Sequence, residues 1–293
     1  MVGRRQWMMG MALALAGCGA RAGQAQAGFA SLPTDFARIE GVHGGRLGVA
    51  VLDTGSGQRT GYRQDERFPL TSTFKLLAAA AVLARVDAGQ DDLERRIRFS
   101  REELVTFSPA TGPRAGAEGM TLAEIAAAAV TLSDNTAGNL LLNVLGGPMG
   151  LTAWLRQRGD EVSRLDRMET ELNEAREGDP RDTTSPAAML AHLHALTLGD
   201  ALSAPSRARL RGWMRASKTG DNCLKARLPR GWVVEDKTGA GENGTRNDVG
   251  LLWPPGGGAP VLVAAYLTGG AAVLAARDAV LAEVGAAVAA AVR

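Results

Sequence analysis

The sequence is poor in cysteine and histidine, with two cysteines and three histidines among its 293 residues. His192 and His194 lie two positions apart in a segment that reads as a helix, where such positions point to different sides. No acidic ligand or further histidine-rich motif accompanies them, so we expect no metal and no cofactor. With His43 as the only other histidine, a Ser-His-Asp triad is also disfavoured.

The N-terminus has the pattern of an export signal. Arg4 and Arg5 precede an apolar run at 7–17, and Ala25-Gln26-Ala27 is a small-x-small cleavage site. The run is too short to span a bilayer as a stable helix. The paired arginines admit the twin-arginine route, and the four residues ending at Cys18 resemble a lipoprotein box. Cleavage after Ala27 and lipidation at Cys18 both stay open, and both predict a periplasmic or secreted protein.

The remaining chain lacks an excess of either charge and lacks a second long apolar run. Removing residues 1–27 takes away three arginines and no acidic residue, which changes the formal net charge from +2 to −1. Nothing therefore indicates a nucleic-acid partner, and no membrane span is expected. Cys223 would be the single cysteine left, so no intramolecular disulfide can form. With 45% hydrophobic residues and no disulfide, the stability must come from the hydrophobic core. We also expect the protein to be a monomer.

Strand and helix patterns follow one another in a simple order. The segments that read as strands are 46–57, 58–70, 231–241, 245–257 and 259–270. The segments that read as helical are 71–88, most of 100–214, and 271–293. Within 100–214, loops rich in Gly, Pro and Asp are expected at 108–119, 146–150 and 173–186. Because sequential hairpins give antiparallel pairing, we predict an α+β fold. It contains an antiparallel five-stranded sheet flanked by N- and C-terminal helices, with an inserted all-helical lobe.

The same order predicts one domain with two lobes. The domain would span 28–293, with an α/β lobe at about 28–66 and 217–293 and a helical lobe at about 67–216. Sites in such proteins lie where two structural units meet. We therefore expect the functional residues between the sheet and the helical lobe.

The tripeptide Lys-Thr-Gly occurs twice, at 218–220 and at 237–239. The first copy stands between two segments that read as helices, 203–217 and 222–228, where Gly220 fits a helix C-cap. The second copy ends a strand-like run, and Gly239 and Gly241 would let a ligand lie close to that strand. The second copy is therefore expected to line a site, and the first to mark a helix boundary.

Two further motifs carry hydroxyl, amine and amide groups. Ser72 and Lys75 lie three apart at a helix start, so the amine can reach the hydroxyl and activate a weak nucleophile. The alternative is a serine cap and a solvated lysine. Ser133-Asp134-Asn135 offers a proton relay and a substrate-binding amide, or, alternatively, a helix N-cap.

A fourth motif stands at the head of a long irregular loop. Glu169 is followed four residues later by Asn173, and the loop continues to about residue 186. A loop of this length in a compact domain is usually functional. It therefore joins the other motifs as a candidate part of the site.

With S-x-x-K, S-D-N, E-x-x-x-N and K-T-G in this order, the chain resembles class A β-lactamases over nearly all of 46–293. The resemblance implies a two-step acyl transfer in which Ser72 attacks a lactam carbonyl. The base would be Lys75 directly or Glu169 through a water. Backbone N–H groups of Ser72 and Ala240 would form the oxyanion hole, and Ser133 would pass a proton to the departing nitrogen.

The resemblance also implies binding and supporting roles. Glu169 and Asn173 would hold the hydrolytic water, and Arg167 with Asp182 would form a salt bridge that pins their loop. The residues implied in substrate binding are Asn135, Asn173, Lys237, Thr238, Gly239, Arg246 and, at the mouth of the site, Phe107. Lys237, Thr238 and Arg246 would bind the carboxylate beside the lactam nitrogen.

Two other functions share part of this pattern. A penicillin-binding D,D-peptidase or esterase has S-x-x-K and K-T-G but lacks the E-x-x-x-N loop. A penicillin-sensing domain becomes acylated without hydrolysis and normally carries membrane spans. One departure from the lactamase pattern is Thr170, because many relatives have proline after the glutamate, with a cis bond there. The sequence leaves the geometry of this bond and the range of β-lactams open.

Overall fold

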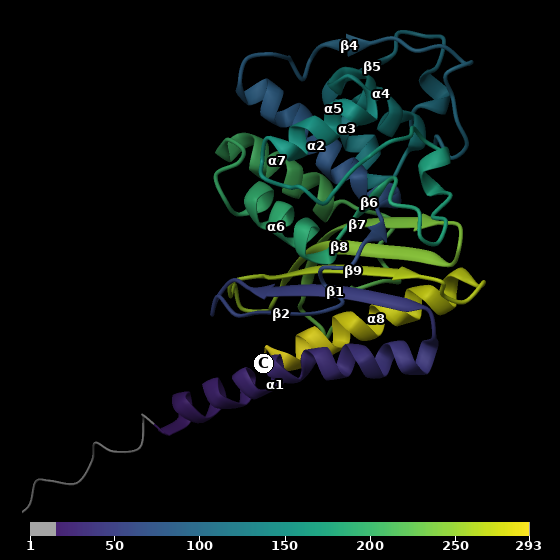
Figure 1. The fold of residues 1–293 in the computed structure, drawn as a ribbon. Helices are drawn as coiled ribbons and strands as arrows, with labels where there is room; N and C mark the ends of the chain where they lie inside the picture. The colour runs from purple at the N-terminus through teal and green to yellow at the C-terminus, as the bar shows by residue number, and fades with distance from the viewer. Residues whose placement is uncertain (1–15, 293) are drawn as a thin grey trace, which may run out of the picture.

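A five-stranded antiparallel sheet separates two layers of helices (Figure 1). The computed structural model describes the backbone of residues 16–292 and the side chains from residue 28 to residue 292. The strand order is β2-β1-β9-β8-β7. The strands of this sheet are β1 Arg46–Asp53, β2 Arg59–Tyr62, β7 Val233–Gly241, β8 Thr245–Trp253 and β9 Val261–Thr268. The α+β fold and the antiparallel sheet predicted from the sequence are confirmed.

Helices and short strand pairs complete the fold. The helices are α1 Ala16–His43, α2 Phe74–Asp87, α3 Leu122–Thr131, α4 Asn135–Leu145, α5 Gly147–Arg156, α6 Pro186–Thr197, α7 Ala204–Arg215 and α8 Leu274–Ala291. The 3-10 turns are Thr71–Thr73, Gly112–Arg114 and Glu171–Asn173. The short pairs are β3 Phe68–Pro69 with β6 Thr183–Thr184, and β4 Arg96–Ile97 with β5 Met120–Thr121.

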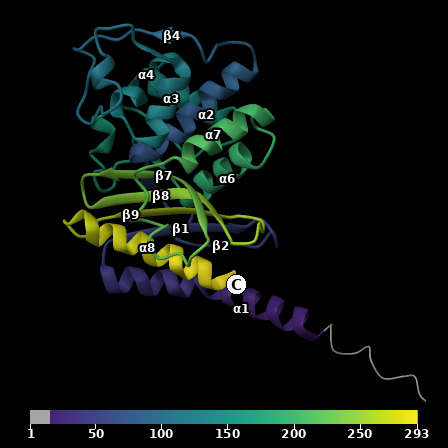
Figure 2. The same cartoon turned by 180° about the vertical axis from the view of Figure 1, so that it is seen from behind.

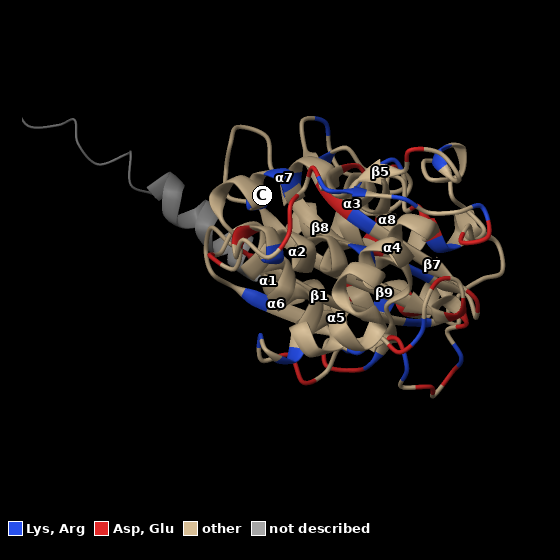
Figure 3. Ribbon diagram, turned by 90° about the horizontal axis from the view of Figure 1, so that it is seen from above, with Lys and Arg blue, Asp and Glu red and all other residues tan. Residues whose placement is uncertain are grey.

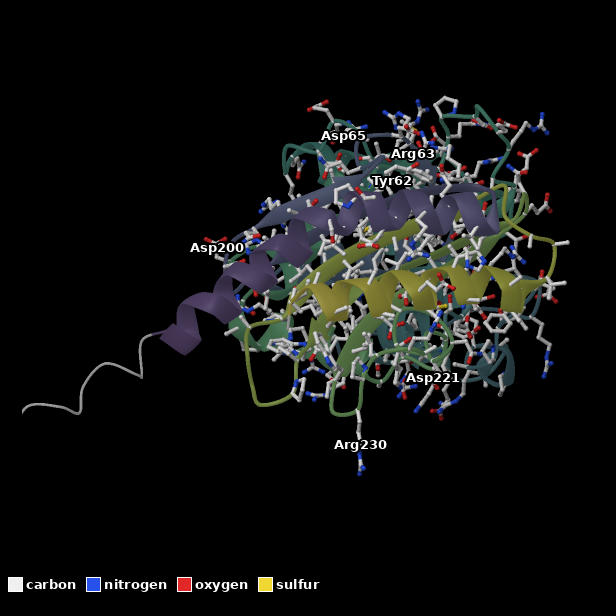
Figure 4. The ribbon with its side chains drawn as sticks, turned by 90° about the horizontal axis from the view of Figure 1, so that it is seen from below. Tyr62, Arg63, Asp65, Asp200, Asp221 and Arg230 are labelled. Carbon is white, nitrogen blue, oxygen red and sulfur yellow. The ribbon has the colours of Figure 1, made fainter. Side chains whose placement is uncertain are left out.

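Helices α1 and α8 lie side by side across one face of the sheet (Figure 4). Their apolar side chains and those of the sheet form one core, which includes Phe36 and Val284. Glu40 ties the end of α1 to the sheet edge, because its carboxylate accepts hydrogen bonds from the Tyr62 hydroxyl and the Arg63 guanidinium, both at 2.9 Å. The first and last helices therefore cover the face of the sheet that is turned away from the helical lobe.

The other face of the sheet carries α6 and, beyond it, the rest of the helical lobe (Figure 2). Helix α2 lies at the centre of this lobe, and all ten residues from Phe74 to Leu83 are buried. Its alanines allow neighbouring helices to approach closely, since their side chains add little volume. Lys75 is the one charged residue in this buried stretch, so it needs polar partners inside the lobe.

Two segments differ from the sequence-based expectation. Residues 147–150, expected as part of a loop, form the first turn of α5, because Gly146 (φ 88°) and Gly147 (φ 82°) turn the chain and Pro148 suits an initial helical turn. Residues 222–228, expected to be helical, form consecutive turns. The first KTG therefore stands in a loop that follows α7 and not between two helices.

The predicted export signal lies largely outside the described residues. Residues 1–15 are not described, and the side chains of 16–27, including Cys18 and Ala27, are not described either. The predictions of cleavage and of lipidation therefore stay predictions. Among the described helices, none is both long enough and apolar enough to cross a bilayer.

Candidate active site

Ser72 and Lys75 meet at the start of α2. Ser72 lies in the 3-10 turn that precedes the helix, and the Lys75 ammonium donates a hydrogen bond of 2.8 Å to the Ser72 hydroxyl. Lys75 Nζ also lies 2.7 Å from Glu169 Oε1 and donates to Asn135 Oδ1 at 2.7 Å. Burial lowers the pKa of Lys75, and the Glu169 carboxylate opposes that shift. A depressed pKa increases the fraction of the neutral amine, which is the form that can accept a proton.

Glu169 is held from three sides. Its Oε1 lies 3.5 Å from the Ser72 hydroxyl, and its Oε2 accepts a hydrogen bond of 2.5 Å from the Asn173 amide. Its backbone N–H donates to Asn139 Oδ1 at 2.8 Å, and its carbonyl accepts from Asn139 Nδ2 at 3.0 Å. The peptide bond between Glu169 and Thr170 is cis. The carboxylate therefore faces the hydroxyl and amine at the start of α2.

Asn139 is a supporting residue that the sequence analysis missed. It lies on α4 four residues after Asn135, so both side chains project from one face of the helix. That spacing is visible in the sequence, but asparagine is common on helix surfaces. Only the distance to the Glu169 backbone shows what the side chain binds.

Residues 164–182, called the glutamate loop below, are pinned by Arg167 and Asp182. The Arg167 guanidinium donates a hydrogen bond of 2.6 Å to Asp182, and Asp182 also accepts from the backbone N–H of Arg167 at 3.0 Å. Arg167 lies 2.5 Å from Glu174 as well. Neighbouring acidic and basic residues of this kind also occur in other surface loops of the molecule (Figure 3). Because Asp182 is buried, removing Arg167 would leave an uncompensated charge inside the loop.

Lys237 brings the strand side of the site to the helical lobe. It lies on β7, is fully buried, and its ammonium donates a hydrogen bond of 3.0 Å to the Ser133 hydroxyl. Burial, with a further contribution from Lys75, lowers the pKa of Lys237 to about 7. The second KTG is therefore linked to the S-D-N motif by a direct bond.

The S-D-N motif forms the connection between α3 and α4. Asp134 caps α4 through a hydrogen bond from the Ala137 N–H, while its other oxygen accepts from the Thr111 N–H. The Asn135 N–H donates to the Phe107 carbonyl at 3.0 Å, and the Phe107 side chain is 60% exposed. Asp134 therefore caps α4, as the N-cap alternative predicted, while Ser133 and Asn135 contact Lys75 and Lys237.

The end of β7 and the facing part of β8 contain the other expected residues. Thr238 donates a hydrogen bond of 2.6 Å to the Thr219 hydroxyl, and Gly239 precedes the exposed Ala240. Arg246 lies opposite Ala240 in the strand register and is largely buried. Its guanidinium donates to Asp278 on α8 at 2.6 Å. Asp278 is a second partner that the sequence analysis did not identify.

Arg246 also contacts the single thiol of the described side chains. Its Nη2 lies 3.0 Å from Cys223 Sγ and donates to the Thr219 carbonyl at 3.2 Å. Burial raises the pKa of the Cys223 thiol. The arginine is thus anchored at several points beneath the end of β7.

Seven of the expected residues form one hydrogen-bonded group, in which the Ser133 carbonyl joins Ser133 and Lys237 to Lys75. They are Ser72, Lys75, Ser133, Asn135, Glu169, Asn173 and Lys237. The group offers a hydroxyl in contact with an amine and a carboxylate, which is the arrangement needed to activate a nucleophile. In the described part of the chain, no group of three or more His, Cys, Asp or Glu could hold a metal ion.

Comparisons with known proteins point to one family. The family model described as "Beta-lactamase enzyme family" matches residues 32–292. The chain is 48% identical to β-lactamase FAR-1 of Nocardia farcinica (strain IFM 10152) over 274 residues, which cover 89% of this chain and 87% of that protein. It is also 48% identical to β-lactamase L2 of Stenotrophomonas maltophilia over 252 residues, covering 86% and 83%.

Solved structures give the same result. An ancestral (GNCA) class A β-lactamase matches with a TM-score of 0.86 and 60% identity, over 88% of this chain and 98% of that one. The putative class A β-lactamase PenP from Rhodopseudomonas palustris matches with a TM-score of 0.86 and 57% identity, over 88% and 98%. The residues matched by the family model, 32–292, include the sheet and the helical lobe.

Proposed function

This chain belongs to the class A β-lactamase family, and from that premise we propose that it hydrolyses β-lactams through an acyl-enzyme on Ser72, which a water activated by Glu169 then releases. One observation carries the proposal. The Lys75 amine lies 2.8 Å from the Ser72 hydroxyl and 2.7 Å from the Glu169 carboxylate, in a fully buried position. A nucleophile, an amine and a carboxylate at such distances can exchange a proton during both steps of acyl transfer.

In the first step the Ser72 oxygen bonds to the lactam carbonyl carbon. Its proton passes to Lys75 directly, or to Glu169 through a water, and the carbonyl oxygen becomes an oxyanion. Backbone N–H groups of Ser72 and Ala240 stabilise this oxyanion, and one such donor typically contributes about 3–4 kcal/mol. The carbon–nitrogen bond then breaks, the Ser133 hydroxyl gives its proton to the departing nitrogen, and the proton that the base took from Ser72 returns to Ser133. The bond from Lys237 to Ser133 supports this role.

In the second step a water attacks the ester carbonyl. Glu169 takes the water's proton, and the Ser72 oxygen leaves and recovers a proton. The bond from Asn173 to Glu169 Oε2 and the two bonds from Asn139 to the Glu169 backbone support this role, since they fix the carboxylate beside Ser72. Arg167 and Asp182 stabilise the glutamate loop in this arrangement.

Substrate binding is proposed for residues around these groups. Thr238 and Lys237, with Arg246, bind the carboxylate beside the lactam nitrogen, while Gly239 lets the substrate lie close to β7. Asn135 binds the side-chain amide, and the exposed Phe107 contacts the substrate at the edge of the site. Lys75 and Arg246 are paired with Glu169 and Asp278, so the protonated form of the buried Lys237 is the charge that favours an anionic substrate.

Intact-mass spectrometry with a penicillin tests the mechanism. The wild-type chain should show rapid turnover, and Glu169→Ala should show a persistent adduct on Ser72, because the deacylating base is missing. Ser72→Ala, as the control, should show no adduct. An equally persistent adduct on the wild type would favour the penicillin-sensing domain. Turnover of D-Ala-D-Ala peptides without β-lactam hydrolysis would favour the D,D-peptidase or esterase.

We also propose that the catalytic unit is residues 28–293 and that it acts as a monomer after export to the periplasm or medium. The α/β lobe would comprise about 28–66 and 217–293, and the helical lobe about 67–216. One hydrophobic cluster packs α1 and α8 on the sheet, and the other joins the opposite sheet face to the helical lobe, which supports a single domain with two lobes. The mass and N-terminal sequence of the exported protein distinguish cleavage after Ala27 from lipidation at Cys18.

A further inference from the structure

Asn247 is a fully buried polar residue that none of the proposed chemical steps uses. It lies near the start of β8, opposite Gly239 of β7 and Tyr266 of β9. A buried amide is unfavourable in a core unless its polar atoms find partners. The partners of Asn247 therefore indicate what the residue does.

The Asn247 amide group binds the segment that leads into Ser72. The two hydrogens of its Nδ2 face three acceptors, the Pro69 carbonyl at 2.9 Å, the Leu70 carbonyl at 3.2 Å and the Thr71 hydroxyl at 3.0 Å, so one hydrogen is shared. Carbonyl oxygens only accept, so the NH2 group, and not Oδ1, must face this segment. Within the described chain Oδ1 has no hydrogen-bond partner. The unpaired Oδ1 lowers the stability of the fold, so the presence of asparagine at this position favours a functional role for its NH2 group.

The same segment crosses directly over Gly239. A Cβ atom at Gly239 would lie 2.1 Å from Thr71 Oγ1 and 3.2 Å from the Leu70 carbonyl oxygen. Thr71 has φ 43°, in the left-handed region that a β-branched residue rarely adopts. Such a conformation persists only where the surrounding contacts hold it. Asn247 supplies contacts to Thr71 and to the residue before it.

We propose that Asn247 is a positioning residue that sets the spacing between the two backbone N–H groups of the oxyanion hole. Ser72 directly follows Thr71, whose hydroxyl Asn247 binds, and Ala240 directly follows Gly239, which lies opposite Asn247 in the strand register. Each N–H donor is therefore one residue away from a residue that Asn247 contacts. Asn247 acts through the backbone and does not touch the substrate. The inference rests on the proposed function, because it assigns the oxyanion hole to Ser72 and Ala240.

Stopped-flow acylation and infrared spectroscopy of the acyl-enzyme test this role. Asn247→Ala and Asn247→Asp should slow acylation by a chromogenic cephalosporin about 10- to 100-fold, because misplaced donors lose transition-state stabilisation. In a Glu169→Ala background, which accumulates the acyl-enzyme, the ester carbonyl band should move to higher wavenumber, because its hydrogen bonds weaken.

Leu251→Ala is the matched control. Leu251 is a buried core residue of the same strand, opposite Glu235. This variant should lower the melting temperature while leaving the acylation rate and the carbonyl band unchanged. Asn247 variants that lose stability in the same way, with an unchanged rate or an unchanged band, would overturn the proposal.

A second variant decides the question if the Asn247 variants do not fold. Thr71→Val keeps the shape of the side chain and removes one acceptor, so it should slow acylation about three- to tenfold and shift the band in the same direction. An unaltered rate and band would reject the role of Asn247. The proposed function has its own test: it is wrong if the Glu169→Ala variant, with Asn247 intact, accumulates no acyl-enzyme.

Discussion

The tripeptide Lys-Thr-Gly occurs twice in this chain, and the two copies touch through their threonines. In the copy on β7, Lys237 is fully buried and bonds to Ser133. In the copy after α7, the Lys218 side chain is exposed, although its backbone N–H donates to the Thr131 carbonyl. The same three residues thus supply a buried charge in one place and a solvated charge in the other.

The difference comes from the backbone that carries each copy. A strand between two layers directs its lysine toward the helical lobe, whereas a loop at the surface leaves its lysine in water. The first copy is nevertheless more than a chain turn. Thr219 accepts a hydrogen bond from Thr238, and the Thr219 carbonyl accepts one from Arg246. Through these two contacts, the first copy supports Thr238 and Arg246 at the end of the sheet.

Replacing the two lysines should give the largest contrast. Lys237→Ala should lower kcat/KM for a penicillin about 10²- to 10³-fold, because it removes a buried charge that holds Ser133 and attracts the substrate carboxylate. Lys218→Ala should remain within about twofold of the wild type. Arg230→Ala, at a side chain that points into solvent (Figure 4), is a second surface control. Similar losses for Lys218→Ala and Lys237→Ala would break the comparison.

Replacing the two threonines should give a smaller contrast. Thr238→Val should raise KM about 10- to 100-fold, because a hydrogen bond to a charged carboxylate is lost. Thr219→Val removes only the hydroxyl that accepts from Thr238, so we expect an increase of about two- to fivefold. Steady-state kinetics on both variants measure this, and circular dichroism checks that they fold. If the order of the two effects were reversed, the first copy would itself contact the substrate.

The pH dependence of KM should show the smallest effect. With a pKa of about 7, Lys237 loses its proton in the free enzyme as the pH rises, and binding of a carboxylate weakens. A bound carboxylate that raises this pKa by about one unit should make KM increase about tenfold between pH 6 and 9. Lys237→Arg keeps its charge over this range and should flatten the rise, while Lys218→Ala should keep it. A wild-type KM that is constant across the range would contradict a depressed pKa at Lys237.

Much of the fold could be predicted from the sequence, because the strands near the C-terminus alternate with clear Gly and Pro turns. The predicted loop at 146–150 was wrong for its last four residues, since Gly147 and Pro148 serve equally well in a turn and in the first turn of a helix. The helix expected in 222–228 was also wrong. That segment packs against the sheet, where the Leu224 N–H bonds to Asp248. Tertiary contacts override local preference there.

The motifs predicted which side chains gather, but not what holds them in place. Asn139, Asn247 and Asp278 carry no motif, and each acts on a residue distant in the sequence. Such contacts depend on strand register and helix packing, which a pattern of residue types does not specify. Sequence therefore indicates the reacting groups, while the structure identifies their supports.

The buried thiol of Cys223 can report local opening of the structure around β8 and α8. From residue 28 onward the chain contains no other cysteine, and this thiol is fully buried against Arg246 and Asp278. A thiol reagent can reach it only while the packing around β8 and α8 is transiently lost, so its modification rate follows that local fluctuation. In a chain that starts at residue 28, local opening of this part of the enzyme can thus be followed in solution without introducing a cysteine by mutation.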